Sequence, residues 1–303
     1  MGFMDLSGSL GRHFGSIGVA LNEINTRLTL SAATELTISG CAPQRSEKTV
    51  KRFCEVLNVS GKLHIEFESA IPEHVGLGSG TQLALAIGMA LNAFYDLGLT
   101  VRDIAQLSDR GARSGIGIGV FEQGGLVVDG GRGEKTKTPP MISQMTIPDD
   151  WRFILVFDKR GQGLHGQQEV QAFKELPPFP QQEAARLCYL LLMQGLPAVA
   201  EDDIELFGDV ITQLQQSVGE HFSAAQGGVF TSPEVATEME WLQQQGAVAI
   251  GQTSWGPTGF CAVRGELKAQ ELITELERRN SATNLYFQMT KATNNSAEVS
   301  AYP

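Results

Sequence analysis

The chain has 303 residues, of which 42% are hydrophobic and 19% are charged, and its formal net charge is −11. This length accommodates two packed lobes with well-filled cores. Binding to a phosphate backbone needs a basic surface, so the acidic balance argues against a nucleic-acid partner. No stretch reaches the roughly 18 apolar residues of a membrane helix, and no secretory signal is found. We therefore expect no membrane partner and a cytoplasmic location.

The four cysteines are too widely spaced to form a metal knuckle of the C-x-x-C type. They stand at positions 41, 54, 188 and 261. In a cytoplasmic chain such cysteines are expected to be reduced and buried, without a structural zinc ion.

Residues 1–148 are predicted to form the first lobe. Hydrophobic periodicity predicts its elements. In chain order they are strands within 16–40, a helix at 46–58, a strand at 63–68, a buried helix at 81–97, an amphipathic helix at 101–112, a short strand within 124–131 and a closing loop at 132–148.

Residues 149–291 are predicted to form the second lobe, followed by a polar, mobile tail at 292–303. Glycines and prolines separate its elements. These are a strand at 151–157, helices at about 181–194, 198–217 and 233–245, strands at 247–252 and 260–264, a helix at 266–279 and a strand at 284–291.

A glycine-serine loop that runs directly into an apolar helix is the strongest functional motif. Gly76, Gly78 and Gly80 lack Cβ atoms and leave the backbone open to a ligand. The free N–H groups of the first helical turn favour an anion such as phosphate, and Ser79 and Thr81 add hydroxyl donors. The alternative is an ordinary turn with a helix N-cap.

Three glycine segments occur in the order found in the GHMP superfamily of small-molecule kinases. They are residues 72–80, 114–125 and 251–259. The resemblance implies an α+β fold of two lobes, the first similar to domain 2 of ribosomal protein S5 and the second ferredoxin-like. Those kinases commonly carry Ser-Gly-x-Asp in the second segment, whereas this chain has Gly117 in place of the aspartate. The missing carboxylate weakens a kinase interpretation.

The chain also resembles the β-ribofuranosylaminobenzene 5′-phosphate synthases, which share this fold. The matching segments are residues 2–6 with 11–16, 76–84, 110–117, 121–131 and 254–259. This resemblance implies condensation of phosphoribosyl pyrophosphate with 4-aminobenzoate and release of CO₂ and pyrophosphate, in tetrahydromethanopterin biosynthesis. Such a reaction needs no strong base. An ATP-dependent kinase and a non-catalytic nucleotide- or small-molecule-binding protein stay as alternatives, and 4-hydroxybenzoate stays as an alternative acceptor.

The synthase resemblance suggests a role for each candidate residue. The expected catalytic residues are Asp5, Arg12 and Arg113. The expected ligands of Mg²⁺ are Asp5 and Glu122. ATP is not expected to be required. The residues expected to bind phosphate or substrate are His13, Gly76, Gly78, Ser79, Gly80, Thr81, Arg110, Ser114, Ser254, Trp255, Gly256 and Thr258. Three of these roles have plain alternatives: Asp5 as a turn cap, Arg113 as an ion-pair partner of Glu122, and Trp255 as a core aromatic.

The N-terminal segment carries one further expectation. Both families normally have a strand before the motif at residues 2–5, and this sequence has only Met1 there. We therefore expect that the first strand is missing and that an edge of the first sheet is exposed. A homodimer is expected only because dimers are common.

Overall fold

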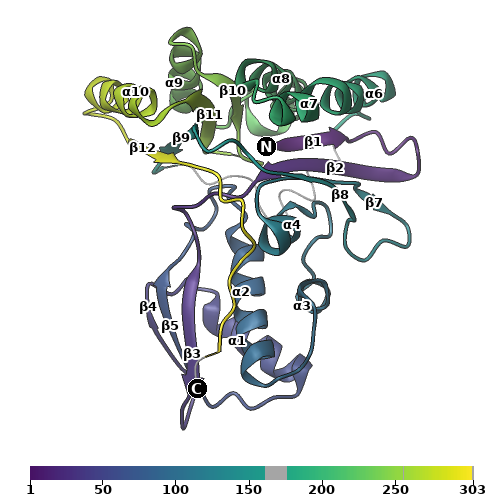
Figure 1. Ribbon diagram of the computed structural model, residues 1–303, viewed down its shortest axis with the longest axis vertical. Helices are drawn as coiled ribbons and strands as arrows, with labels where there is room; N and C mark the ends of the chain where they lie inside the picture. The colour runs from purple at the N-terminus through teal and green to yellow at the C-terminus, as the bar shows by residue number, and fades with distance from the viewer. Residues whose placement is uncertain (161–175, 255, 302–303) are drawn as a thin grey trace.

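The computed structural model describes residues 1–160, 176–254 and 256–301. Its first sheet has the strand order β1-β2-β6-β8, with β7 paired to β2 (Figure 1). These strands are β1 (Gly2–Asp5), β2 (Arg12–Val19), β6 (Leu126–Asp129), β7 (Arg132–Gly133) and β8 (Met141–Met145). Strand β1 pairs antiparallel with β2. The motif at residues 2–5 is therefore itself the edge strand, which corrects the expectation that the first strand is missing.

A smaller sheet and four helices complete the first half of the chain. The sheet has the order β3-β5-β4, with strands at Arg27–Ala32, Leu63–Ser69 and Thr37–Gly40. The helices are α1 (Ser46–Leu57), α2 (Ser79–Phe94), α3 (Val101–Leu107) and α4 (Ile116–Gln123). Helix α2 is the buried centre of this half, because Leu85, Ile87 and Leu91 are fully shielded from solvent.

The second half forms an antiparallel sheet with the order β10-β11-β9-β12. Its strands are β10 (Val248–Gln252), β11 (Gly259–Arg264), β9 (Trp151–Asp158) and β12 (Leu285–Thr290). Its helices are α6 (Gln181–Leu190), the π-helical turn Leu191–Gly195, α7 (Leu196–Ala200), α8 (Ile204–Gln226), α9 (Pro233–Gln244) and α10 (Glu266–Arg279). None of the helices in the described part of the chain combines the length and apolarity needed to cross a bilayer.

The two halves share part of one hydrophobic core. Met4 and Ile17 from the first sheet pack in the same buried cluster as Trp151, Phe207 and Leu214 from the second half. In Figure 1 the β1–β2 hairpin accordingly lies directly beneath α6, α7 and α8. The glycine loop before α2 also contacts the second half, since Thr253 Oγ1 donates to the carbonyl of Val75. The α+β class is as expected.

Several local expectations differ from the structure. Residues 132–148, expected to be a loop, contain strand β8. Helix α4 was not predicted, because its sequence is rich in glycine and β-branched residues, which disfavour a helix. The segment after β12 is not a mobile tail over residues 292–297, because Thr293 N–H donates to the carbonyl of Ala20 and Ala297 N–H donates to that of Phe121. All four cysteines are free, but Cys41 and Cys188 are exposed rather than buried.

Candidate functional site

The glycine-serine loop ends at an uncapped helix N-terminus. Gly76 and Gly78 have φ angles of 75° and 72°, which glycine adopts readily. Helix α2 begins at Ser79, and none of the described side chains caps its start with a hydrogen bond. Thr81 N–H donates to the carbonyl of Gly78 at 3.0 Å, so the N–H groups of Ser79 and Gly80 are the ones left to bind an anion. The helix dipole favours negative charge there.

Two arginines lie against this N-terminus. A Cβ atom built at Gly80 would lie 2.9 Å from Nη1 of Arg45 and 3.2 Å from Nη1 of Arg110. The two side chains come from different elements, Arg45 from the start of α1 and Arg110 from the segment after α3. Arg110 is a predicted site residue. The sequence offered no indication of Arg45, because only the packing of α1 beside α2 brings it here.

The positive charge at this position is only partly balanced. Arg45 forms an ion pair with Glu73. In contrast, Nε of Arg110 is buried and has no hydrogen-bond partner among the described residues. Burial lowers the pKa of the Arg110 guanidinium, and the neighbouring charges of Arg45 and Arg52 lower it further. Arginine nevertheless stays protonated. An anion at this site would therefore accept a hydrogen bond from the buried Nε of Arg110 and reduce the repulsion between the arginine charges.

The start of α4 packs directly on the start of α2. A Cβ atom at Gly117 would lie 2.8 Å from Cγ2 of Thr81, and Nε2 of Gln82 donates to the carbonyl of Gly117 at 2.7 Å. An aspartate at position 117 would displace Thr81. The position that holds a carboxylate in many kinases of this fold is thus filled by helix packing. Ser114 Oγ accepts a hydrogen bond from Ile116 N–H at 3.3 Å, just before this contact.

The third glycine segment contacts the first. Thr253 Oγ1 donates to the carbonyl of Val75 at 2.8 Å, and Thr253 N–H donates to the carbonyl of Thr258 at 2.9 Å. Thr258 is fully buried, and its Oγ1 has no partner among the described residues. All three glycine segments therefore meet around the N-terminus of α2.

The loop between Thr253 and Thr258 has an irregular backbone. Ser254 has a φ of 42° and Gly256 a φ of 67°. Gly256 N–H donates to the carbonyl of Thr253 at 2.6 Å, which closes a tight turn. Trp255 lies outside the described residues, so that its expected role as a wall against an aromatic ring stays a prediction.

Asp5, Arg12 and His13 form a separate group at the β1–β2 hairpin. Oδ1 of Asp5 accepts hydrogen bonds from Ser7 N–H at 2.8 Å and Gly8 N–H at 3.2 Å. The carboxylate thus caps a turn, the alternative that the sequence had left open. The His13 ring packs closely over Gly8. In the described part of the chain no hydrogen bond or ion pair joins these three side chains to residues 76–81.

Arg12 is held by backbone carbonyls. Its Nε and Nη2 donate to the carbonyls of Gly130 and Gly131, both at 2.8 Å. Asp129, just before this turn, is fully buried. The sequence match included Asp129, but no role was expected for it. Arg113 lies two residues before Gly115, whose N–H binds Asp129.

The expected Mg²⁺ ligands are not arranged as a metal site. Oε2 of Glu122 is 3.0 Å from Nη2 of Arg102, so this carboxylate is paired with an arginine. The alternative left open by the sequence had named Arg113 as its partner. Oδ1 of Asp5 already accepts hydrogen bonds from the N–H groups of Ser7 and Gly8. No group of three or more His, Cys, Asp or Glu side chains suited to a metal gathers anywhere in the ranges 1–160, 176–254 and 256–301. The described residues thus form no cluster that would hold Mg²⁺ without the phosphates of a substrate, and the expected Mg²⁺ ion stays a prediction.

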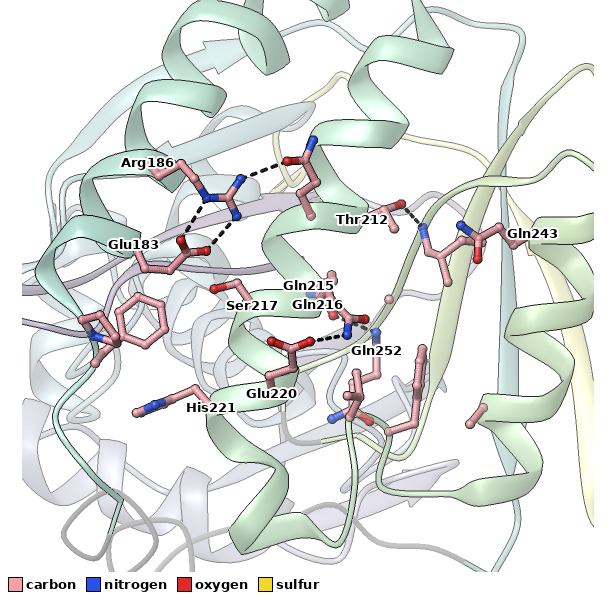
Figure 2. Close-up of a pocket in the computed structure, with 18 of the residues that line it drawn as sticks. Glu183, Arg186, Thr212, Gln215, Gln216, Ser217, Glu220, His221, Gln243 and Gln252 are labelled. Carbon is pink, nitrogen blue, oxygen red and sulfur yellow. Dashed lines mark hydrogen bonds and ion pairs between the residues drawn. The ribbon is translucent and has the colours of Figure 1, made fainter.

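A cavity lies elsewhere, on the second half of the chain. It has a volume of about 1150 Å³ and is lined by α6, α8, α9 and β10. Figure 2 shows that its polar side chains pair with one another: Arg186 with Glu183, and Gln216 with Glu220. The edge of β10 is satisfied as well, since Thr212 Oγ1 accepts from Ile250 N–H at 3.0 Å. This cavity leaves few polar groups in need of a ligand.

Comparison with known proteins identifies the family. The GHMP kinases N terminal domain matches residues 45–124, and the GHMP kinases C terminal domain matches residues 196–282. The chain is 37% identical over 272 residues to a beta-ribofuranosylphenol 5′-phosphate synthase of Archaeoglobus fulgidus, with 85% of this chain and 82% of the relative covered. It is 30% identical over 279 residues to the protein of the same name from Methanothermobacter thermautotrophicus, with 85% and 84% covered.

The fold is also that of solved GHMP kinases. Galactokinase of Lactococcus lactis, in complex with galactose, superposes with a TM-score of 0.67 at 12% sequence identity, covering 97% of this chain and 91% of the galactokinase. Identity at that level supports the fold alone. The similarity to the two archaeal synthases extends over most of both chains, and the protein therefore belongs to the family of the beta-ribofuranosylphenol 5′-phosphate synthases.

Proposed function

We propose that this protein joins phosphoribosyl pyrophosphate to 4-aminobenzoate, as a β-ribofuranosylaminobenzene 5′-phosphate synthase of tetrahydromethanopterin biosynthesis. The bond between C1 of the ribose and pyrophosphate breaks, and C1 bonds to the ring carbon that carries the carboxylate. The carboxylate then leaves as CO₂, and its electron pair restores the aromatic ring. No proton has to be removed in these steps.

The proposal rests on one observation: an anion site lies at the N-terminus of α2, and no carboxylate stands at position 117 to act as a base. Arg45 and Arg110 converge on the uncapped N-terminus of α2, and position 117 is filled by packing against Thr81. A kinase of this fold would use that position to assist a substrate hydroxyl. Departure of pyrophosphate instead needs stabilisation of developing negative charge, which preorganised arginines and helix N–H groups supply.

The proposed roles follow from these positions. Arg45, Arg110 and the first turn of α2 bind a phosphate group of the donor. Arg12 lies at the β1–β2 hairpin, and Arg113 lies in the segment before α4. These two arginines balance the remaining anionic groups, which are the other phosphate groups of the donor and the benzoate carboxylate. Mg²⁺ is proposed only as the ion that accompanies pyrophosphate, since the described residues do not form a site of their own for it. We derive no catalytic step through it.

The acceptor has two candidates, because the relatives are named for a ribofuranosylphenol. An amino or a hydroxyl group at position 4 of the benzoate would serve the reaction equally, since either donates electrons to the attacking ring carbon. We place the reaction in the cytoplasm, with small molecules and no nucleic acid or membrane as partners. A homodimer stays a proposal.

The test is an assay with carboxyl-labelled substrate. Protein, phosphoribosyl pyrophosphate, Mg²⁺ and either 4-aminobenzoate or 4-hydroxybenzoate are incubated without ATP. We expect CO₂ and pyrophosphate in equal amounts with at least one acceptor. No release with either acceptor, together with ATP consumption on small alcohols, would instead establish a kinase. Inactivity in both assays would leave a binding protein.

A further inference from the structure

The buried carboxylate of Asp129 connects two motifs that are far apart in the sequence. Asp129 is the last residue of β6 and is 0% exposed. Its Oδ2 accepts a hydrogen bond from Gly115 N–H, and its Oδ1 accepts one from Gly131 N–H, both at 2.8 Å. Each carboxylate oxygen thus holds a different segment.

The first of these segments is the start of α4. Gly115 is the N-cap residue of α4, and no side chain of the described residues makes a local cap there. The carboxylate of Asp129 supplies the negative charge that a helix N-terminus favours. From this point the chain continues to Gly117, which packs on Thr81 at the start of α2. Asp129 therefore fixes where the second glycine segment meets the first.

The second segment is the Gly130–Gly131 turn, which binds Arg12. Gly131 has a φ of 63°, and a Cβ atom there would lie 2.3 Å from the carbonyl oxygen of His13. The turn is thus tightly packed between Asp129 and β2. Since the carbonyls of Gly130 and Gly131 accept both hydrogen bonds of Arg12, the direction of this guanidinium depends on the turn.

We infer that Asp129 is a positioning residue, which fixes Arg12 relative to residues 113–117. The inference rests on the proposed function, since it takes Arg12 as a partner of the anionic donor. Burial raises the pKa of Asp129, and the hydrogen bonds from Gly131 and Gly115 oppose that rise. Asp129 touches no substrate itself and acts through Arg12 and α4.

Asparagine has nearly the same shape but only one accepting oxygen, so Asp129→Asn loses one of the two hydrogen bonds. We expect the KM for phosphoribosyl pyrophosphate to rise about tenfold, with kcat changed less than about threefold. Arg12→Ala is expected to give a similar rise. Because both changes act on the same group, the double variant should be no more than about twofold worse than either single variant. Effects that multiply would overturn the inference.

Asp158→Asn is the matched control. Asp158 is also a buried carboxylate at the end of a strand, and it accepts hydrogen bonds from Ser232 and Arg160. Among the described residues it makes no hydrogen bond to Arg12, Gly115 or Gly131, the groups through which Asp129 is inferred to act. Its substitution should lower the melting temperature and leave the KM for the donor unchanged. Equal rises in KM for the two variants would show that Asp129 has only a structural role.

A second measurement does not depend on turnover or on the folding of Asp129→Asn. In an NMR comparison of the wild type with Arg12→Ala, the amide signals of Gly131 and Gly115 should both shift, because Asp129 joins them. A shift of Gly131 alone would overturn the inference. An inactive wild type in the synthase assay would refute the proposed function, while the amide signals would still report on Asp129.

Discussion

The N-terminus of α2 and the large cavity beside α8 differ in how their polar groups are satisfied. At α2 a buried arginine nitrogen lacks a partner among the described residues, and the helix start is uncapped. In the cavity, arginine, glutamate and glutamine side chains bind one another (Figure 2). The start of α2 therefore gains more from a ligand than the cavity does. Unsatisfied charge, rather than volume, identifies the site.

Replacing a single arginine in each region tests this comparison most strongly. Arg110→Met keeps an unbranched side chain and removes the charge beside α2. We expect kcat/KM for phosphoribosyl pyrophosphate to fall about a hundredfold, as for loss of a charged group that stabilises a phosphate. Arg186→Met in the cavity is the control and should change kcat/KM less than about twofold. Equal losses in the two variants would remove the distinction between the regions.

Gly80→Ala changes the site without removing a charge. The new Cβ would meet the guanidinium groups of Arg45 and Arg110, which must then move away from the helix start. We expect the donor KM to rise about tenfold. The melting temperature should not fall, since Gly80 is the second residue of α2 and alanine is a better helix former than glycine. Gly61→Ala, where the nearest atom is Cys54 Sγ at 3.9 Å, should leave the KM as it is. An unchanged KM in Gly80→Ala would show that the arginines do not bind the donor.

Asp158 shows a buried charge whose partners are complete, and its loss should affect stability only. Burial alone would raise the pKa of Asp158, but hydrogen bonds from Arg160 and Ser232 outweigh it and lower the pKa to about 2. The stabilisation is therefore present above the ordinary value of 3.8 and is lost as the pH falls through about 2. Asp158→Asn should lower the free energy of unfolding by about 1–3 kcal/mol at neutral pH.

The same variant gives a second readout in acid titration. Between about pH 4 and pH 2 the free energy of unfolding of the wild type should fall more steeply than that of Asp158→Asn. Chemical denaturation at each pH measures both slopes. Parallel slopes would mean that Asp158 is not held ionised by its partners.

Gln216→Ala is expected to have the smallest effect. This side chain lines the cavity and binds Glu220 on the same helix. A pair of this kind is worth about 0.2–0.5 kcal/mol, so stability should change by no more than that and turnover should stay constant. A rise in donor KM beyond about threefold would point to a ligand in the cavity after all.

Local patterns predicted the elements that are long and periodic. The helix expected at 266–279 has the bounds of α10, and the strand at 63–68 is β5 with one residue added. The pattern failed for α4, where Gly119 is required by close packing: a Cβ atom there would lie 2.3 Å from Met141 Sδ. Tertiary contacts of this kind override helix propensity and leave no periodic trace in the sequence.

The site was predictable where one segment carries it and not where folding assembles it. Gly76, Gly78 and Gly80 are adjacent in sequence, and their loop leads to the expected helix start. Arg45 and Asp129 are brought in by α1 and β6, so neither was expected to belong to the site. Conversely, Glu122 was expected to reach a metal but pairs with Arg102, 20 residues away.

Titration calorimetry of phosphoribosyl pyrophosphate with Mg²⁺ tests the central claim most directly, because it measures donor binding without turnover. The account predicts binding to the wild type, at least about tenfold weaker binding to Arg110→Met, and unchanged binding to Arg186→Met. Binding that is lost in Arg186→Met and retained in Arg110→Met would contradict it and place the donor in the cavity beside α8.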